Sequence, residues 1–546
     1  MTHSVLRQAL GISSRSGSPV AKAGRRPPVL KATTGMLFAS SIVYIALRVW
    51  SIWTPHLWGD ELFNYSLSQG SWITLFKRLG LDMAHPPLFY VLLKPWIYIA
   101  QSSMSGLRVF TVAISVATIV PLILLGRELG FRTHEIALAL GLLAVNNYLI
   151  VYSYYLRPYS LLLFLTVCSN VAFVRFLRRG QADKNRSLLI LTIINVLFVY
   201  THYFAWLVVA AQCLWVAFTK RRQLRQMTAA AAIIVFCFLP WVAVIVYVSS
   251  KVSVTFWGQA SWDRPPDSQS VLLLLRCFNG GFQSTGLTIA GSAVFLLLAI
   301  VALTRKDSVI AATTQPEGAD LKPLALLAWL AGFPLVVSFA VAYALTWKWV
   351  PRYVIVSIAP YLLLLSACAF RLRTPAARAL AVGFLLGWAT IAGLNNDLAE
   401  TLHGPNAPSY LLAQDLSRAE TRTQGPIPIY GLSPYAEQGL RLGLSLTGEQ
   451  RFKTIACRVD VLLPDDYFWI ALTEHDPLAN ARVKTLASDP AYSLGEPLYR
   501  GAPPQRHILI PVRQVNRKGT IPASLVTMDL SVEQLSASPH RVGDDD

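Results

Sequence analysis

Charged residues are scarce in this chain of 546 residues. They make up 14% of the sequence, whereas 54% of it is hydrophobic, and the mean hydropathy is +0.46. Because a soluble globular protein carries about 25% charged residues, this deficit excludes a soluble protein and indicates many segments solvated by lipid. The same composition excludes disordered, collagen-like and coiled-coil chains.

Cysteine and acidic residues are also few. The six cysteines show no CxxC spacing, so neither a zinc site nor a disulfide framework is indicated. The 29 Asp and Glu residues stand against 48 Lys and Arg, a formal charge of +19. In a soluble protein this excess would suggest a nucleic acid partner. In a membrane protein it can be the positive-inside signal, and we expect no nucleic acid partner.

Long apolar runs, in contrast, are abundant. Eleven of them can form helices of about 20 residues, and no small-residue cleavage site follows the first. The basic segment 1–35 is therefore predicted to be a cytoplasmic tail before an uncleaved span. The predicted spans are 36–53, 107–126, 133–151, 158–175, 187–203, 204–219, 228–248, 284–304, 323–346, 352–370 and 376–394.

Charge counting decides the role of the shorter apolar stretch 85–100. If it does not cross the membrane, the cytoplasmic segments hold 23 Lys and Arg and the opposite loops hold 9. Making it a span would put the basic clusters outside. We therefore predict a juxtamembrane or re-entrant helix at the outer leaflet, with everything after about 397 extracytoplasmic.

The composition changes after the last span, because Pro, Asp, Glu and Gln return. The sequence thus divides into the tail 1–35, a transmembrane domain 36–396, a small α/β domain 397–513 and a disordered tail 514–546. Within the α/β domain we expect helices at 409–421 and 434–446, and strands at 427–432, 459–463, 467–472 and 507–512.

The predicted spans carry few ionisable groups at mid-membrane, where a transporter holds its substrate or ion. Polar residues gather instead at the outward helix ends. The first group is Trp58-Gly59-Asp60-Glu61, just beyond the first span. Adjacent carboxylates at a lipid boundary repel each other and lose solvation, so one can have a raised pKa and act as a base. An ordinary solvated loop pair remains the alternative.

The second group is His85-Pro86-Pro87-Leu88-Phe89-Tyr90. Proline suits the first helical position, so His85 is expected to cap a helix N-terminus, where an anion is favoured. A histidine that only anchors the helix at the interface is the alternative.

Arginine lies beside proline at two outward-facing helix starts, in Arg157-Pro158-Tyr159 and in Pro351-Arg352-Tyr353. A guanidinium binds phosphate through a planar, bidentate fork, so the pair can clamp a phosphate. Snorkelling to lipid headgroups is the alternative.

A tight outward turn contains Thr201-His202-Tyr203-Phe204, and its histidine is either structural or part of the site. The outer tryptophans are attributed to the aromatic belt of the membrane interface; they are Trp257, Trp262, Trp347 and Trp349.

In this order and on these loops, the motifs resemble the GT-C superfamily of membrane glycosyltransferases, over roughly residues 36 to 395. The nearest branch is that of the protein mannosyltransferases and the aminoarabinose lipid A transferases. Many relatives have a small residue followed by Arg-Met-Tyr where this chain has Leu156-Arg157-Pro158-Tyr159.

The resemblance implies a GT-C fold of about 11 transmembrane helices with juxtamembrane helices in the first outer loop. It implies an inverting transferase that moves a sugar from a polyprenyl-phosphate donor to an acceptor hydroxyl of a glycolipid, polysaccharide or protein. Asp60 is then the base, with Glu61 orienting the site or a metal, and Arg157 and Arg352 hold the donor phosphate. The remaining residues assigned to substrate binding are His85, Tyr159, His202, Tyr203 and Tyr353.

No cofactor is certain, and a divalent metal stays open. The alternatives are a transporter or flippase for a lipid-linked saccharide, and an assembly scaffold with a degenerate site.

Overall fold

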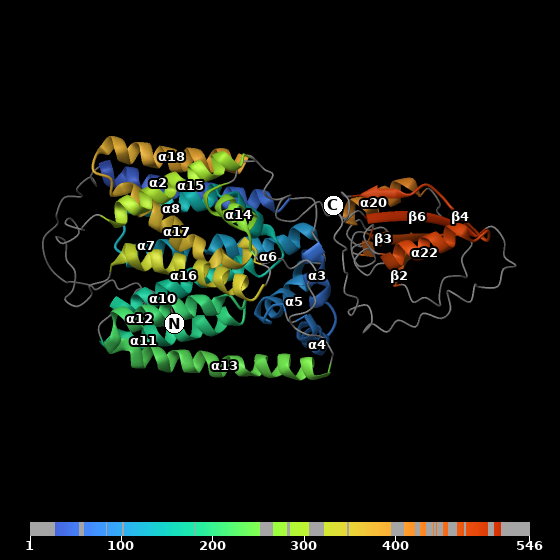
Figure 1. Ribbon diagram of the computed structural model, residues 1–546, viewed down its shortest axis with the longest axis horizontal. Coiled ribbons are helices and arrows are strands. Elements are labelled where there is room, and N and C mark those ends of the chain that lie inside the picture. Colours follow the sequence, from blue (N-terminus) through green and yellow to red (C-terminus); the bar gives the residue numbers. More distant parts are fainter. Residues whose placement is uncertain are drawn as a thin grey trace, which may run out of the picture.

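The structure is a computed structural model in which a helical bundle is followed by a small sheet (Figure 1). The described residues are 28–53, 59–82, 84–100, 103–178, 181–251, 266–280, 284–304, 322–346, 349–394, 409–420, 426–432, 440–441, 444, 451–456, 467–473, 477–500 and 507–514. The predictions for residues 1–27 and for the tail after 514 lie outside them.

Every predicted span contains a helix. The bundle helices are α2 (Pro28–Ser51), α6 (Met104–Ala117), α7 (Ile119–Glu128), α8 (Thr133–Val145), α9 (Asn147–Tyr154), α10 (Tyr159–Arg178), α11 (Gln181–Val199), α12 (Ala205–Thr219), α13 (Leu224–Lys251), α14 (Ser268–Asn279), α15 (Thr285–Leu303), α16 (Pro323–Ala344), α17 (Ile358–Phe370) and α18 (Pro375–Leu394). The 3₁₀ helices are η1 (Arg221–Gln223) and η2 (Pro351–Ser357).

Within the described residues, seven helical segments are long and apolar enough to cross a membrane. The chain is thus a multi-pass membrane protein. Helices α8 and α9 together are also long and apolar enough, but they bend by 66° at Asn146, as in a broken span or a re-entrant loop. The Asn146 side chain caps α9 by accepting from the Leu149 N–H. The predicted spans 204–219 and 284–304 form the shorter apolar helices α12 and α15. The predicted span 187–203 lies in α11, which begins earlier, with the charged stretch 181–186.

Three short helices form a layer at one end of the bundle (Figure 1). They are α3 (Gly59–Ser68), α4 (Trp72–Asp82) and α5 (Leu88–Ala100). Helix α5 has 13 residues, too short to span a bilayer, which agrees with the prediction for 85–100. Lys94 of α5 donates to the carbonyls of Ser68 and Gly70 and so fastens the three helices together.

Helices α10 and α17 are buried along most of their length and form the centre of the bundle. Inside it, Ser169, Asn195 and Gln212 join α10, α11 and α12 through hydrogen bonds of 2.6–3.1 Å. These polar groups are uncharged, so they hold helices together without the desolvation of an ion.

The C-terminal part is an α/β domain built on a six-stranded sheet of order β2-β1-β3-β6-β4, with β5 paired to β6. Strands β1 to β3 are parallel, and β6 is antiparallel to β3, β4 and β5. The elements are α20 (Ser409–Ala419), β1 (Ile427–Gly431), β2 (Phe452–Ala456), β3 (Tyr467–Thr473), α22 (Pro477–Ser488), β4 (Tyr492–Leu494), β5 (Leu498–Arg500) and β6 (His507–Gln514).

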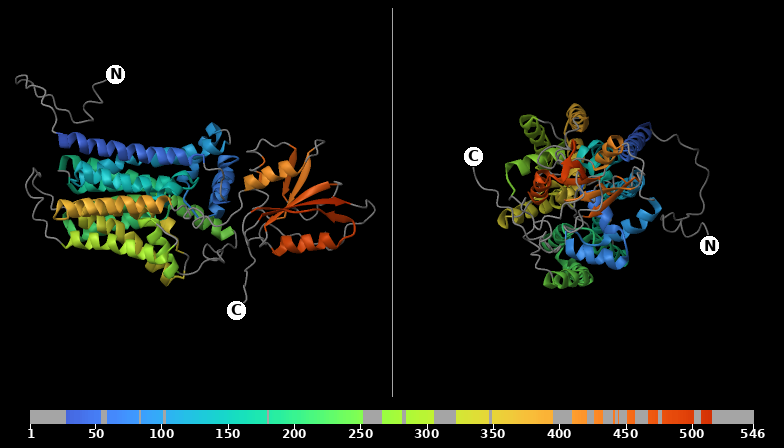
Figure 2. Two further views of the ribbon diagram at one scale, coloured as in Figure 1. Left: turned by 90° about the horizontal axis from the view of Figure 1, so that it is seen from above. Right: turned by 90° about the vertical axis from the view of Figure 1, so that its right-hand side faces the viewer.

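One face of the sheet packs on α20 and the other on α22, so each face has its own apolar core. The predicted strands at 427–432, 467–472 and 507–512 are confirmed, whereas β2, β4, β5 and α22 were not predicted. Strand 459–463 and most of helix 434–446 lie outside the described residues. Figure 2 shows the sheet beyond the same end of the bundle as α3 and α5.

Candidate active site

The carboxylate of Asp60 joins three segments that are far apart in the sequence. It lies in the first turn of α3, and its Oδ2 accepts a hydrogen bond from Arg157 Nη2 at 2.8 Å and from Arg352 Nη1 at 3.4 Å. Arg157 directly precedes the start of α10, and Arg352 lies in the first turn of η2. The predicted convergence of one carboxylate and two guanidinium groups is therefore found in the structure.

Local chain geometry places these groups at element starts. Helix α3 begins at Gly59, so Asp60 lies where the helix dipole favours a carboxylate. Pro351 begins η2, and its carbonyl accepts a hydrogen bond from the hydroxyl of Tyr148 at 3.0 Å. This bond ties the arginine-bearing turn to α9.

The two arginines decide the ionisation of Asp60. Partial burial on its own raises the pKa of this carboxyl, whose side chain is 40% exposed, but Arg157 and Arg352 outweigh it and hold the pKa below its usual value. The raised pKa that we expected from the adjacent carboxylates is thus wrong for Asp60, because its near neighbours are guanidinium groups. Burial on its own lowers the pKa of Arg157, but the charge of Asp60 and the neighbouring tyrosines together outweigh burial, so the pKa is raised.

Glu61 faces a different part of the protein. Its Oε2 lies 3.6 Å from Nη2 of Arg108 in a fully buried ion pair, and its Oε1 accepts the N–H of Leu156 at 2.8 Å. The residue next to Leu156 is Arg157. These contacts favour the orienting role that the resemblance implies for Glu61.

Sequence reasoning missed Asn64 and Tyr90. Asn64 is fully buried and its Oδ1 accepts from Arg157 Nη1 at 3.2 Å and from the Tyr90 hydroxyl at 3.1 Å. Its Nδ2 donates to the Leu156 carbonyl at 2.7 Å. Asn64 lies four residues after Asp60, so the two side chains share one face of α3. This spacing is the sequence signal that could have identified Asn64.

Two histidines pack beside the arginines. The rings of His85 and His202 have centroids 5.1 Å apart, and Leu88 N–H donates to the Tyr200 carbonyl at 2.9 Å to hold the two loops together. The expected capping role of His85 is wrong. Helix α5 begins at Leu88, and the carbonyl of Pro87 accepts its first helical bond, so His85 lies before the helix and is buried.

Both histidines are neutral near pH 7. Burial, together with the positive charges of Arg157 and Arg352, lowers the pKa of His202 to about 3. Burial, with Arg157 next, also lowers the pKa of His85 well below its usual value. Protonating a buried imidazole beside two guanidinium groups would add a third positive charge to the site, which is unfavourable.

The predicted tyrosines divide into two groups. The rings of Tyr159 and Tyr353 lie 6.0 and 5.9 Å from that of His202, so both join the cluster. The Tyr203 hydroxyl instead accepts from Trp241 Nε1 at 3.2 Å and secures the turn on α13. Trp349 is buried and donates to Ser338 at 3.0 Å, so its expected place in the interface belt is wrong.

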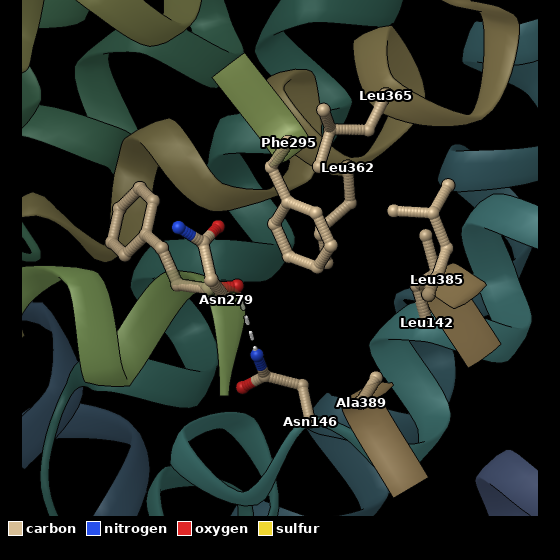
Figure 3. A pocket seen from close by; sticks show the side chains of 9 residues that line it. Leu142, Asn146, Asn279, Phe295, Leu362, Leu365, Leu385 and Ala389 are labelled. Atoms are coloured by element: carbon tan, nitrogen blue, oxygen red, sulfur yellow. Dashed lines mark hydrogen bonds between the residues drawn. The ribbon is translucent and has the colours of Figure 1, made fainter. Parts of the chain in front are cut away.

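Two cavities lie outside this cluster. One of about 10 Å³, room for about one water molecule, is lined by Asn146, Asn279 and apolar side chains (Figure 3). The other, of about 500 Å³, is an apolar groove between α11 and α13 that reaches Leu197 and Cys237. Within the described part of the chain, no group of three His, Cys, Asp or Glu side chains could hold a metal ion.

The bundle, the juxtamembrane layer and the site at its end define a multi-pass membrane protein with the GT-C fold that the sequence motifs imply. Two solved structures of ArnT from Cupriavidus metallidurans have this fold. The complex with undecaprenyl phosphate is 12% identical with a TM-score of 0.56, and the apo form is 14% identical with a TM-score of 0.58. In both comparisons 88% of this chain matches 98% of the other. No protein-family model matches the sequence, and no curated protein matches it either.

The buried Glu61–Arg108 pair gives the first testable prediction. Glu61→Gln leaves an uncompensated guanidinium in a dry environment, which should destabilise the folded protein by about 3 kcal/mol. Thermal unfolding in detergent measures this. Adding Arg108→Met should recover much of the loss. Arg418→Gln, which removes the 76% exposed partner of a 4.0 Å pair with Asp415, should have almost no effect. A Glu61→Gln protein as stable as this control would contradict the prediction.

Proposed function

We propose that this protein is a membrane glycosyltransferase that moves a sugar from a polyprenyl-phosphate donor to an acceptor hydroxyl at the extracytoplasmic face. One observation carries the proposal: Arg157 and Arg352 both bind the same carboxylate oxygen of Asp60. This contact lies at the end of the bundle that bears the juxtamembrane helices. Two guanidinium groups around one anion form a site that also suits a phosphate.

In this proposal, Asp60 occupies the anion site until the donor arrives. The donor phosphate takes hydrogen bonds from Arg157 and Arg352, and the carboxylate is released from them. The positive charge of the two arginines, which lowers the pKa of Asp60, is then shared with the phosphate. Partial burial still raises the pKa of Asp60. Donor binding therefore makes Asp60 a stronger base at the moment when a base is needed.

The chemistry is a single displacement with inversion. The acceptor oxygen forms a bond to the anomeric carbon, and the bond between that carbon and the phosphate oxygen breaks. The phosphate leaves with the electron pair, and Asp60 takes the proton of the acceptor hydroxyl. Because the leaving phosphate is a weak base, it needs charge stabilisation more than a general acid, and the two arginines supply it.

The lipid part of the donor is supported by two observations. The ArnT structure with the same fold is bound to undecaprenyl phosphate. The apolar groove between α11 and α13 ends at Cys237, whose carbonyl accepts from the Tyr200 hydroxyl at 2.7 Å. Tyr200 lies two residues before His202, so a prenyl chain in this groove would lead its phosphate toward the site.

The orientation rests on the charge asymmetry of the loops. With 23 Lys and Arg on one side and 9 on the other, the N-terminus is cytoplasmic, and the active site and the α/β domain are extracytoplasmic. The acceptor is a glycolipid, polysaccharide or protein that presents a hydroxyl there.

A release assay with Asp60→Asn tests the function directly. Purified wild-type protein in detergent, given a panel of polyprenyl-phosphate sugars and candidate acceptors, should release free lipid phosphate from at least one donor. Asp60→Asn should bind that donor at least as tightly but turn it over about 10²- to 10⁴-fold more slowly, because it lacks the base. Near-normal transfer by the variant would remove the base assignment. A transporter would release no lipid phosphate in detergent.

Arg157→Ala tests the phosphate clamp. A hydrogen bond to a charged group is worth roughly 1.5–3 kcal/mol, so affinity for undecaprenyl phosphate should fall by roughly 10- to 100-fold. Binding to the detergent-solubilised protein measures this, and Lys77→Ala, an exposed cation on α4, is the control. Unchanged affinity in Arg157→Ala would make this arginine a headgroup anchor only.

A further inference from the structure

We infer that His85, His202 and Tyr159 form an uncharged hydrogen-bonding subsite for the sugar of the donor, which selects a neutral pentose or hexose over an amino sugar. This inference rests on the proposed function and names its substrate class. It is carried by the polar atoms that the cluster leaves without partners.

Three side chains from separate segments carry these atoms. The Tyr159 hydroxyl, His85 Nδ1 and His202 Nε2 are buried and have no hydrogen-bond partner among the residues that the structure describes. The residues are 0%, 5% and 3% exposed, respectively. A buried polar group without a partner costs free energy, so three such groups gathered around one histidine indicate a place where a ligand completes the bonding.

The tautomer of His202 gives the subsite a donor. Its Nδ1 accepts the backbone N–H of Phe204 at 3.2 Å, and a neutral imidazole that accepts at one nitrogen carries its proton on the other. Nε2–H of His202 is therefore a donor without a partner. The Tyr159 hydroxyl can donate and accept. Together they match hydroxyl groups, which also donate and accept.

The charges around the subsite exclude a cationic sugar. Arg157 and Arg352 contribute two positive charges and Asp60 one negative charge, and both histidines are neutral. The phosphodiester of the donor adds one negative charge and balances the site. An ammonium group on the sugar would be a third cation, and the neighbouring carboxylate of Glu61 is already engaged by Arg108. A hydroxyl at the same position needs no counter-ion.

Matched donors provide the test. Polyprenyl-phosphate arabinose and 4-amino-4-deoxyarabinose differ by one hydroxyl against one ammonium group, and the glucose and glucosamine donors form a second pair. We expect kcat/KM to be at least about 100-fold higher for the neutral member of whichever pair is used, because the unpaired buried cation is disfavoured. Equal or better transfer from the amino donor overturns this inference and leaves the proposed function standing. No release from any donor overturns the proposed function.

A variant separates the sugar subsite from general folding. His202→Phe keeps a ring and removes the Nε2–H donor. It should lower kcat/KM for the neutral donor by about 10-fold or more, with affinity for sugar-free undecaprenyl phosphate within twofold of wild type. His134→Phe, the same change at the start of α8, should alter neither value. If His202→Phe lowers kcat/KM for the neutral donor and affinity for undecaprenyl phosphate by the same factor, this histidine has a structural role and the subsite is overturned.

Discussion

The candidate active site depends on one ionic arrangement, in which the Asp60 carboxylate lies between the guanidinium groups of Arg157 and Arg352. Without the carboxylate, two positive charges would face each other in a partly buried site at the end of an apolar bundle. The pairing holds α3 onto the starts of α10 and η2.

The surroundings keep these charges in position. Glu61 and Asn64 both bond to Leu156, so α3 holds the backbone on which Arg157 is carried. Arg108 balances the charge of Glu61 inside the protein. The imidazoles of His85 and His202 are neutral, so they avoid the repulsion that a charged histidine would add beside two arginines. Asp60 and Glu61 are thus paired with different arginines, although they are adjacent in sequence.

Much of this was predictable, and the failures have physical reasons. The apolar runs predicted the spans, and arginine beside proline at outward helix starts predicted the convergence on Asp60. The ion-pair partner of Glu61 was not predictable, because Arg108 lies 47 positions away in the sequence. Helix α5 starts later than predicted because the carbonyl of Pro87, not of His85, accepts its first helical bond. In the α/β domain, the short strands β4 and β5 carry three residues each, too few for a periodic signal.

A structure of the protein with undecaprenyl phosphate bound tests the central claim most directly. The account predicts the phosphate oxygens within about 2.7–3.1 Å of the Arg157 and Arg352 side chains, with the Asp60 carboxylate moved off both and facing the acceptor side. A phosphate bound elsewhere, with Asp60 still between the two arginines, would contradict it.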